Sequence, residues 1–383
     1  MNPISERQPI PYGKQTIAEE EIAAVIEVLR SDWLTTGPCL DRFEQDLAAY
    51  LGVTDVVAVA NGTAALHAML YAAGIGPGDE VIVPPLTFAA TANAVIYVGA
   101  RPVFVDVDPT TLLINPGAID ALITSATKAV LAVDYAGQPC DYGALRQVTD
   151  KYSLLLLADS CHSLGGTWHG QPCGTQADMS VFSFHPVKPM TTAEGGAVVC
   201  HTSEVAGKLR CFRSHGITTD HHQRQEQGSW FYEMTELGWN YRLSELHAAL
   251  GIVQLGKLDS FTARRQHLAV RYDAAFEQQR QICPLALAPH CGHSHHLYVV
   301  RVPHRDQVFQ QLRTADILVN VHYIPVYLHP WYRQQLGTAE GLCPIAEQAA
   351  ADILSLPIYP GLSDDDQDRV IRELINCVTK EDC

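Results

Sequence analysis

The sequence is short of basic residues. It holds 26 lysines and arginines against 42 aspartates and glutamates, and its formal net charge is −16 at pH 7. Proteins that bind long nucleic acids concentrate the opposite charge, so we exclude that class of partner. A small anionic ligand stays compatible with this charge, because a few backbone amides hold such a ligand locally.

Long apolar runs are also missing. No stretch approaches the roughly 18 consecutive apolar residues that a membrane-spanning helix needs, and residues 1–15 lack the apolar centre of a signal peptide. The 11 cysteines are scattered and odd in number, in a chain of 383 residues that needs no disulfide staples. We therefore expect reduced thiols, a cytoplasmic protein and no membrane partner.

Internal repeats and low-complexity tracts are absent as well, and what is present is an alternation of short apolar runs with helical stretches. The runs are nearly continuous in valine, isoleucine, leucine and alanine, which is typical of strands covered on both faces by helices. We therefore predict an α/β fold with a large, mostly parallel sheet. The expected strands are residues 56–60, 80–84, 102–107, 129–133, 154–159, 179–184 and 196–200, and the expected helices 62–74, 87–99, 116–124 and 142–152.

The pattern changes near residue 256. We expect a long helix over 258–279, then a strand over 296–302, a helix over 306–315, a strand over 318–324 and a last helix over 364–376. A chain of this length suits one large and one smaller domain. We place the large domain at 1–255 and a smaller α/β domain at 256–383.

Ligands of open α/β sheets bind beyond the carboxyl ends of the strands, and three segments fall at such ends. In the first, "NGTAAL" (61–66), a glycine and a threonine separate a strand from a helix. The amides of the first helical turn have no helical partner and suit a phosphate group. A plain turn capped by Asn61 or Thr63 is the alternative.

The second segment, "ADSCHSLGG" (158–166), begins at the end of the strongly apolar run 154–158. Asp159 loses solvation there and needs a cationic partner. One charge pair at about 4 Å is worth roughly 4 kcal/mol at an effective dielectric near 20, or about three pKa units on the partner. That suffices to keep a weakly basic ring nitrogen protonated, although a loop-capping aspartate explains the residue equally well.

The third segment, "SVFSFHPVKPMTTAEGG" (180–196), places Lys188 between Pro186 and Pro189. Prolines stiffen the chain, and a partly buried amine is a nucleophile for a carbonyl. Ser183 adds a hydroxyl for an anion, whereas the plain alternative is an exposed turn lysine. Together, a phosphate cradle, an acid for a ring nitrogen and an amine for an aldehyde suit pyridoxal 5′-phosphate.

Over nearly its whole length the chain resembles the DegT/DnrJ/EryC1/StrS nucleotide-sugar aminotransferases, which have the fold type I architecture of aspartate aminotransferase. Besides the three segments, the resemblance rests on "SDWLTTGP" (31–38), "PPLTFAATANAVIYVGARPVFVDVD" (84–108), "VDYAGQPCD" (133–141), "FRSHGI" (212–217), "GWNYRLSELHAALGIVQLGKLD" (238–259) and "VNVHYIPVY" (319–327). The phosphate turn reads "NGT" where many relatives have "SGT" or "SAT". Some relatives carry histidine at the cofactor lysine and are dehydratases; this chain keeps Lys188.

The resemblance implies a role for each matching position. Lys188 bonds to the cofactor and moves the proton, Asp159 faces the ring nitrogen, and His162 lies near the ring. Phe88 stacks on the ring, although from composition alone it looks like ordinary core. The implied phosphate ligands are Gly62, Thr63, Ala64, Ser183 and, from the neighbouring subunit of a homodimer, Asn240; the implied substrate contacts are Tyr12, Trp33, Leu34, Thr35, His322 and Tyr323.

Within the family, "TTAEGG" and the proline after Lys188 most resemble the branch that transaminates a UDP-sugar at C4 in pseudaminic acid synthesis, with L-glutamate as donor. Enzymes acting at C4 of a GDP-sugar or C3 of a dTDP-sugar are alternatives. An alternative of another class is a metal-binding protein, because residues 290–296 hold four histidines and a cysteine, and "DHHQ" (220–223) adds two histidines. Their spacing matches no standard zinc finger, and we expect no metal.

Overall fold

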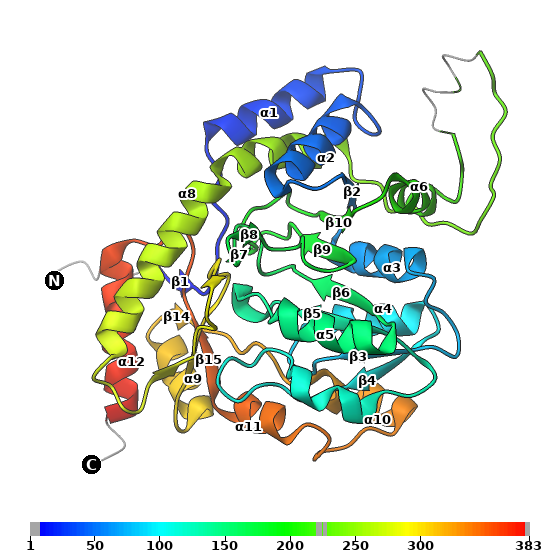
Figure 1. Cartoon of the computed structure of the whole chain (residues 1–383). Coiled ribbons are helices and arrows are strands. Elements are labelled where there is room, and N and C mark those ends of the chain that lie inside the picture. The colour runs from blue at the N-terminus through cyan, green and yellow to red at the C-terminus, as the bar shows by residue number, and fades with distance from the viewer. Residues whose placement is uncertain (1–7, 220–223, 225–227, 380–383) are drawn as a thin grey trace.

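The fold is built around a seven-stranded sheet (Figure 1). We describe residues 8–219, 224 and 228–379 of a computed structural model. In sheet order the strands are β2 (Asp55–Val59), β10 (Gly196–Cys200), β9 (Met179–Ser183), β6 (Leu155–Asp159), β5 (Thr127–Val133), β3 (Glu80–Val83) and β4 (Arg101–Phe104). The strands from β9 to β4 pair in parallel, whereas β10 runs antiparallel to both of its neighbours. The predicted mostly parallel sheet is confirmed.

Helices cover both faces of this sheet. Successive side chains of a strand point to opposite faces, and β2 shows the consequence. Val57 and Val59 join the core that includes residues of helices α3 and α6, whereas Val56 and Ala58 join the core with residues of α2 and α8. Among the described residues, the α-helices of the amino-terminal two thirds are α1 (Glu19–Arg30), α2 (Pro38–Leu51), α3 (Gly62–Ala72), α4 (Ala90–Tyr97), α5 (Tyr142–Tyr152), α6 (Ser203–Phe212) and α8 (Glu245–Phe276).

The carboxyl-terminal third forms a second apolar core around a three-stranded sheet, in the order β11 (Cys283–Pro284), β13 (Tyr298–Arg301) and β15 (Ile353–Leu356). Its helices are α9 (Arg305–Thr314), α10 (Pro330–Leu336), α11 (Pro344–Asp352) and α12 (Asp364–Thr379). Helix α8 runs along this core and the large sheet without a break at residue 255 (Figure 1). The domain boundary at 255 stays a prediction.

Short strands tie the remaining segments together. Strand β1 (Ile10–Pro11) pairs in parallel with β14 (Ile317–Leu318), which brings the amino-terminal segment to the carboxyl-terminal third. A separate three-stranded sheet has the order β12 (Cys291–Gly292), β7 (Thr167–Trp168) and β8 (Gln171–Pro172). The pairing of β12 with β7 places the segment that begins near residue 290 beside the segment that follows Asp159.

Several expected elements differ from the structure. The helix expected over 116–124 is a pair of 3₁₀ turns, Pro116–Ala118 and Asp120–Leu122. Regular strand pairing after 317 ends at Leu318, so most of the strand expected over 318–324 is irregular. The helix expected over 258–279 begins earlier, at Glu245, where the Ser244 side chain accepts a hydrogen bond from the His247 N–H.

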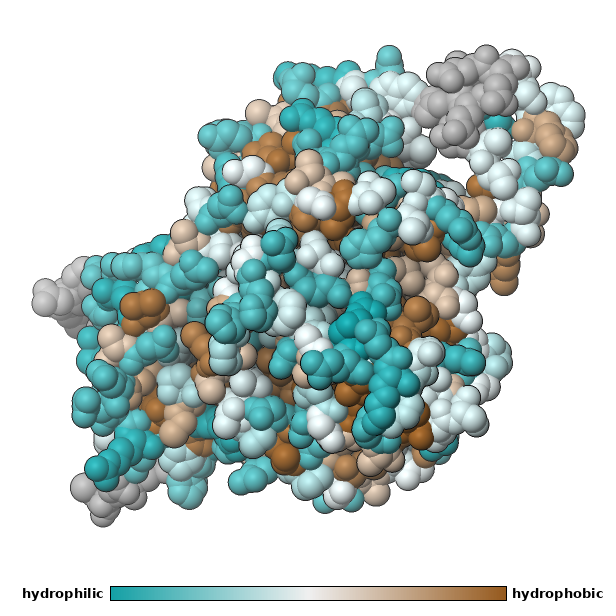
Figure 2. Space-filling model, viewed as in Figure 1, coloured by the Kyte–Doolittle hydropathy of each residue, from teal (hydrophilic) through white to brown (hydrophobic). Residues whose placement is uncertain are grey.

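The segment before α8 stands away from the body of the molecule, and Figure 2 shows apolar residues on it. Trp230 is 86% exposed and Leu237 is 76% exposed. Isolated exposed apolar residues are common, whereas several on one segment are typical of interaction surfaces. Within the described ranges, no helix has the length and apolar character needed to cross a bilayer.

Candidate active site

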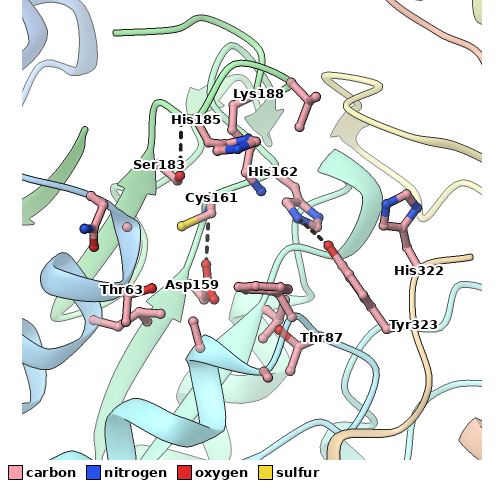
Figure 3. A pocket seen from close by; sticks show the side chains of 18 of the residues that line it. Thr63, Thr87, Asp159, Cys161, His162, Ser183, His185, Lys188, His322 and Tyr323 are labelled. Atoms are coloured by element: carbon pink, nitrogen blue, oxygen red, sulfur yellow. Dashed lines mark hydrogen bonds between the residues drawn. The ribbon is translucent and has the colours of Figure 1, made fainter. Parts of the chain in front are cut away.

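A cavity of about 1170 Å³ opens at the carboxyl ends of the large sheet (Figure 3). Strands β2, β9 and β6 end beside it. They are close together because β9 and β6 are neighbours in the sheet and only β10 separates them from β2. The segments after these strands therefore meet, as expected for this kind of sheet. Of the predicted site residues, those lining the cavity are Tyr12, Gly62, Thr63, Ala64, Phe88, Asp159, His162, Ser183, Lys188, His322 and Tyr323.

The turn between β2 and α3 packs tightly against β9. A Cβ atom at Gly62 would lie 2.8 Å from Ser183 Cβ and 3.1 Å from Ser183 Oγ, so only glycine lets the two backbones approach this closely. Asn61 caps the helix by accepting the Ala64 N–H at 2.8 Å. The N–H groups of Gly62 and Thr63 occupy the first two helical positions, which have no acceptor within the helix and suit an anion.

Lys188 reaches into the cavity from the turn after β9, and Asp159 lies on the opposite side (Figure 3). The Lys188 N–H donates to the His185 carbonyl at 2.9 Å, which closes the turn that the prolines stiffen. Burial lowers the pKa of the Lys188 ammonium below its ordinary value, and the nearby Cys161 and Asp159 partly oppose this shift. An amine with a lowered pKa is more often neutral and is a better nucleophile.

Asp159 ends strand β6 and is 7% exposed. Its Oδ2 accepts a hydrogen bond from Thr91 Oγ1 at 2.7 Å, and its Oδ1 accepts the Cys161 N–H at 3.2 Å. A carboxylate has about four acceptor positions, so Asp159 can accept a further donor from a ligand.

His162 forms the side of the cavity nearest the carboxyl-terminal third. Its Nε2 lies 3.3 Å from the Tyr323 hydroxyl, and its Nδ1 is buried without a hydrogen-bond partner. Burial, with the nearby Lys188 charge, lowers the pKa of His162 well below its ordinary value. The imidazole is therefore neutral and presents an unused polar atom.

Two further residues extend this wall. His322 Nδ1 lies 2.8 Å from Ser355 Oγ, and the ring centroids of His322 and Tyr12 lie 5.1 Å apart. Burial lowers the pKa of His322 to about 3. Tyr12 directly follows β1, and His322 follows β14. The pairing of these two strands therefore brings Tyr12 and His322 together at the cavity.

Phe88 is 60% exposed within the cavity, at a ring-centroid distance of 6.3 Å from Tyr323. The composition-based interpretation of Phe88 as ordinary core is therefore wrong. A large apolar side chain exposed inside a cavity is suited to stack on a planar ligand.

Four predicted residues do not line the cavity of their own chain. Trp33 and Leu34 are 38% and 53% exposed, and Thr35 pairs with Ser244 in an isolated bridge. Asn240 forms a similar bridge with Ser214. The two bridges thus connect Thr35 to the residue before α8 and Asn240 to the segment after α6.

The cavity also has polar residues that sequence reasoning did not assign to it. His185 and Glu194 lie in the Lys188 segment, and Cys161 lies in the Asp159 segment, so their positions in the sequence were the available signal. The remaining residues depend on the tertiary fold for their place at the cavity and are Thr87, His296, Asn320 and His329.

The histidine-rich segment 290–296 forms no metal centre that the structure identifies. Within residues 8–219, 224 and 228–379, no three side chains of histidine, cysteine, aspartate or glutamate gather closely enough to hold a metal ion. His293 and His295 stack on each other with ring centroids 4.0 Å apart. The second part of this hypothesis, residues 220–223, lies outside the described residues.

The lining residues fit pyridoxal 5′-phosphate. The glycine turn against Ser183 leaves room for a phosphate group, and the buried, unpartnered Nδ1 of His162 can meet a polar atom of the cofactor. Asp159 suits the ring nitrogen and Lys188 suits the aldehyde. The fold and this cavity together define a pyridoxal 5′-phosphate enzyme of fold type I.

Comparison with known proteins identifies the family. Residues 15–375 match the DegT/DnrJ/EryC1/StrS aminotransferase family. The spore coat polysaccharide biosynthesis protein SpsC of Bacillus subtilis is 40% identical over 381 residues, which are 97% of this chain and 98% of that protein. The chain therefore belongs to the DegT/DnrJ/EryC1/StrS aminotransferase family and is a pyridoxal 5′-phosphate-dependent sugar aminotransferase.

Solved structures agree with this assignment. Spr1654 from Streptococcus pneumoniae, assigned as a sugar aminotransferase, matches in its PMP and PLP forms with TM-scores of 0.93 and 0.92. Both matches have 34% identity and cover 97% of this chain and 99% of that one. Helicobacter pylori PseC, an aminotransferase of pseudaminic acid biosynthesis, matches with a TM-score of 0.91 and 32% identity over 97% of this chain and 100% of that one.

Proposed function

We propose that this protein transfers an amino group from L-glutamate to the C4 keto group of UDP-2-acetamido-2,6-dideoxy-β-L-arabino-hexos-4-ulose. The product is UDP-4-amino-4,6-dideoxy-N-acetyl-β-L-altrosamine, an intermediate of pseudaminic acid biosynthesis. The observation that carries the proposal is the meeting of Lys188, Asp159 and the Gly62 turn in one cavity. The similarity to Helicobacter pylori PseC supports the choice of sugar.

Each residue has a task in this reaction. Pyridoxal 5′-phosphate supplies the group that accepts and donates nitrogen, and its protonated ring stabilises negative charge on carbon. Lys188 would hold the aldehyde group of the cofactor and would move a proton to and from the reacting carbon, a task that suits an amine with a lowered pKa. Asp159 holds the proton on the ring nitrogen, and Phe88 and His162 fix the ring position.

The phosphate and the substrate occupy opposite ends of the cavity in this proposal. Gly62, Thr63, Ala64 and Ser183 hold the cofactor phosphate, whereas Tyr12, His322 and Tyr323 contact the sugar nucleotide. The Ala64 N–H is engaged by Asn61, so Ala64 contributes through its position in the turn.

We further propose a homodimer with two shared sites that works in the cytoplasm. Trp33, Leu34, Thr35 and Asn240 do not line the cavity of their own chain, and the segment before α8 exposes several large apolar side chains. In a dimer they serve the other cavity, where Asn240 of the partner subunit binds the cofactor phosphate. The cysteines of the described ranges are all free, which suits a reducing compartment.

The substrate is tested by incubating the purified protein and glutamate with each candidate ketosugar. The panel comprises the UDP-linked 4-keto sugar above, the 4-keto precursor of GDP-perosamine and a 3-keto dTDP-sugar. We expect amination of the UDP-sugar alone, seen as the product mass and as nitrogen at C4 by NMR. Efficient amination of a GDP- or dTDP-sugar with no reaction of the UDP-sugar contradicts the proposal.

A further inference from the structure

Two buried threonine hydroxyls form a chain that ends on the Asp159 carboxylate. Thr91 Oγ1 lies 2.7 Å from Asp159 Oδ2, and Thr87 Oγ1 lies 2.7 Å from Thr91 Oγ1. Thr91 is fully buried and Thr87 is 2% exposed. Water therefore does not compete for these hydrogen bonds.

The chemistry of the groups sets the direction of this chain. An ionised carboxylate only accepts hydrogen bonds, so Thr91 donates its proton to Asp159. The Thr91 oxygen is then free to accept the proton of Thr87. Threonine hydroxyls in helices commonly donate to a backbone carbonyl of the preceding turn. Thr91, in the first turn of α4, instead donates to the Asp159 side chain at the end of β6.

A second donor holds the other oxygen of the same carboxylate. Asp159 Oδ1 accepts the Cys161 N–H at 3.2 Å. The two donors come from different elements, since Thr91 belongs to α4 and Cys161 follows β6. Two donors on two oxygens define the plane of the carboxylate more strictly than either does alone.

The threonines belong to the segment that also carries Phe88. The Thr91 N–H donates to the Phe88 carbonyl at 3.2 Å, and both Thr87 and Phe88 line the cavity. One segment, residues 87–91, therefore carries both Phe88, which would stack on the ring, and Thr91, which bonds to Asp159. We propose that Thr91, supported by Thr87, is a positioning residue that fixes the orientation of the Asp159 carboxylate, which would meet the cofactor ring nitrogen.

The inference rests on the proposed role of Asp159, and cofactor binding tests it. The probes are pyridoxal 5′-phosphate and its analogue in which a C–H unit replaces the ring nitrogen, each titrated into cofactor-free protein. We expect Thr91→Val to weaken binding of pyridoxal 5′-phosphate about 10-fold, because a hydrogen bond to a charged group is lost. Thr91→Ser keeps the hydroxyl and stays within about 2-fold of the unmodified protein.

The analogue separates positioning from general damage to the fold. It lacks the nitrogen that Asp159 meets, so the unmodified protein, Thr91→Val and Thr91→Ser should bind it equally well. The pH midpoint of the visible absorbance of the cofactor-loaded protein should move in Thr91→Val and not in Thr91→Ser. If Thr91→Val does not fold, Thr91→Ala compared with Thr91→Ser makes the same test.

Three results overturn the inference. Thr91→Val binds pyridoxal 5′-phosphate as well as the unmodified protein does, or it loses the same affinity for both probes, which indicates a structural role only. The third concerns Asp159→Asn, which should bind the two probes equally. If Asp159→Asn still prefers pyridoxal 5′-phosphate, the role of Asp159 is wrong and this inference falls with it. If only the Thr91 variants fail to behave as expected, the role of Asp159 stands.

Discussion

Close packing at Gly62 shows how a single residue shapes the site. A Cβ atom there would press on Ser183, and a Cβ at Gly196 would lie 2.5 Å from the Asn61 carbonyl oxygen. The turn proposed to bind the phosphate is thus packed closely between strands β9 and β10. Such a turn is pre-organised, so ligand binding does not have to order it.

We expect Gly62→Ala to weaken binding of pyridoxal 5′-phosphate at least about 10-fold and to destabilise the fold by about 1–3 kcal/mol, because Ser183 must shift. Titration of cofactor-free protein and urea unfolding measure the two effects. The matched control is Gly207→Ala in helix α6, where an added Cβ meets no atom within 4 Å. Indistinguishable behaviour of the two variants contradicts this account of the turn.

Residue chemistry at strand ends was predictable, and partners from distant segments were not. Gly62, Asp159 and Lys188 each follow an apolar strand, and parallel strands align their carboxyl ends. Thr91 gave no comparable signal, because its hydrogen bond to Asp159 spans 68 positions of the chain. The residues around Thr91 in the sequence do not indicate that the first turn of α4 will lie next to the end of β6.

Among the elements, the start of helix α2 depends on a side chain from a distant helix. Gly37, at the N-cap position, has no side chain to cap the helix. The Glu245 carboxylate, from the first turn of α8, instead accepts the N–H groups of Gly37, Cys39 and Leu40 at 2.9, 2.7 and 3.0 Å. This buried contact fixes the segment 31–37 against α8.

We expect Glu245→Gln to lower the free energy of unfolding by about 1.5–3 kcal/mol, because the amide nitrogen cannot accept the N–H groups and the charge at the helix start is lost. Chemical denaturation measures this change. Glu204→Gln is the control, since Glu204 also begins a helix but its side chain is 81% exposed; we expect about 0.5 kcal/mol or less there. Equal effects of both substitutions would show that Glu245 does not hold α2.

Most elements of the large sheet were predictable within a few residues, since their strands are continuous apolar runs. The helix expected over 116–124 failed because Pro116 and Gly117 begin a short segment that turns back toward β5, and the Asn115 side chain caps Gly117 within that turn. The helix expected over 87–99 begins only at Ala90, since Thr87 and Phe88 face the cavity. The first difference comes from a local turn, and the second from tertiary contacts that override local propensity.

At the scale of the whole molecule, buried neutral histidines couple stability to pH. Burial lowers the pKa of His295 to about 4 and that of His322 to about 3. The unfolded chain binds protons near pH 6.5 and the folded chain does not, so stability is lost as the pH falls below 6.5. We expect each such histidine to cost roughly 2–3 kcal/mol by pH 4, measured by urea unfolding from pH 7 to pH 4.

His295→Gln provides the control for this prediction. Removing one titrating group should make the loss of stability with falling pH less steep, while the stability at pH 7.5 changes less. Stability that stays constant between pH 7 and pH 5 in the unmodified protein would show that the buried histidines do not act in this way.

A dimer with shared sites makes a second prediction for the whole molecule. Lys188→Ala and Asn240→Ala should each be inactive, but mixed subunits should recover about a quarter of the activity, since half of the dimers are mixed and each has one intact site. Activity of the mixture after unfolding and refolding together measures this. Separately refolded variants mixed at the end are the control, and no recovery in the co-refolded sample contradicts a shared site.

The central claim is that Lys188 carries the cofactor. The most direct test is to load the protein with pyridoxal 5′-phosphate, reduce it with borohydride and locate the fixed phosphopyridoxyl group by peptide mass spectrometry. The account predicts this group on Lys188, with a loss of the visible absorbance in Lys188→Ala. A label on any other lysine, or a Lys188→Ala protein that keeps both absorbance and turnover, would contradict it.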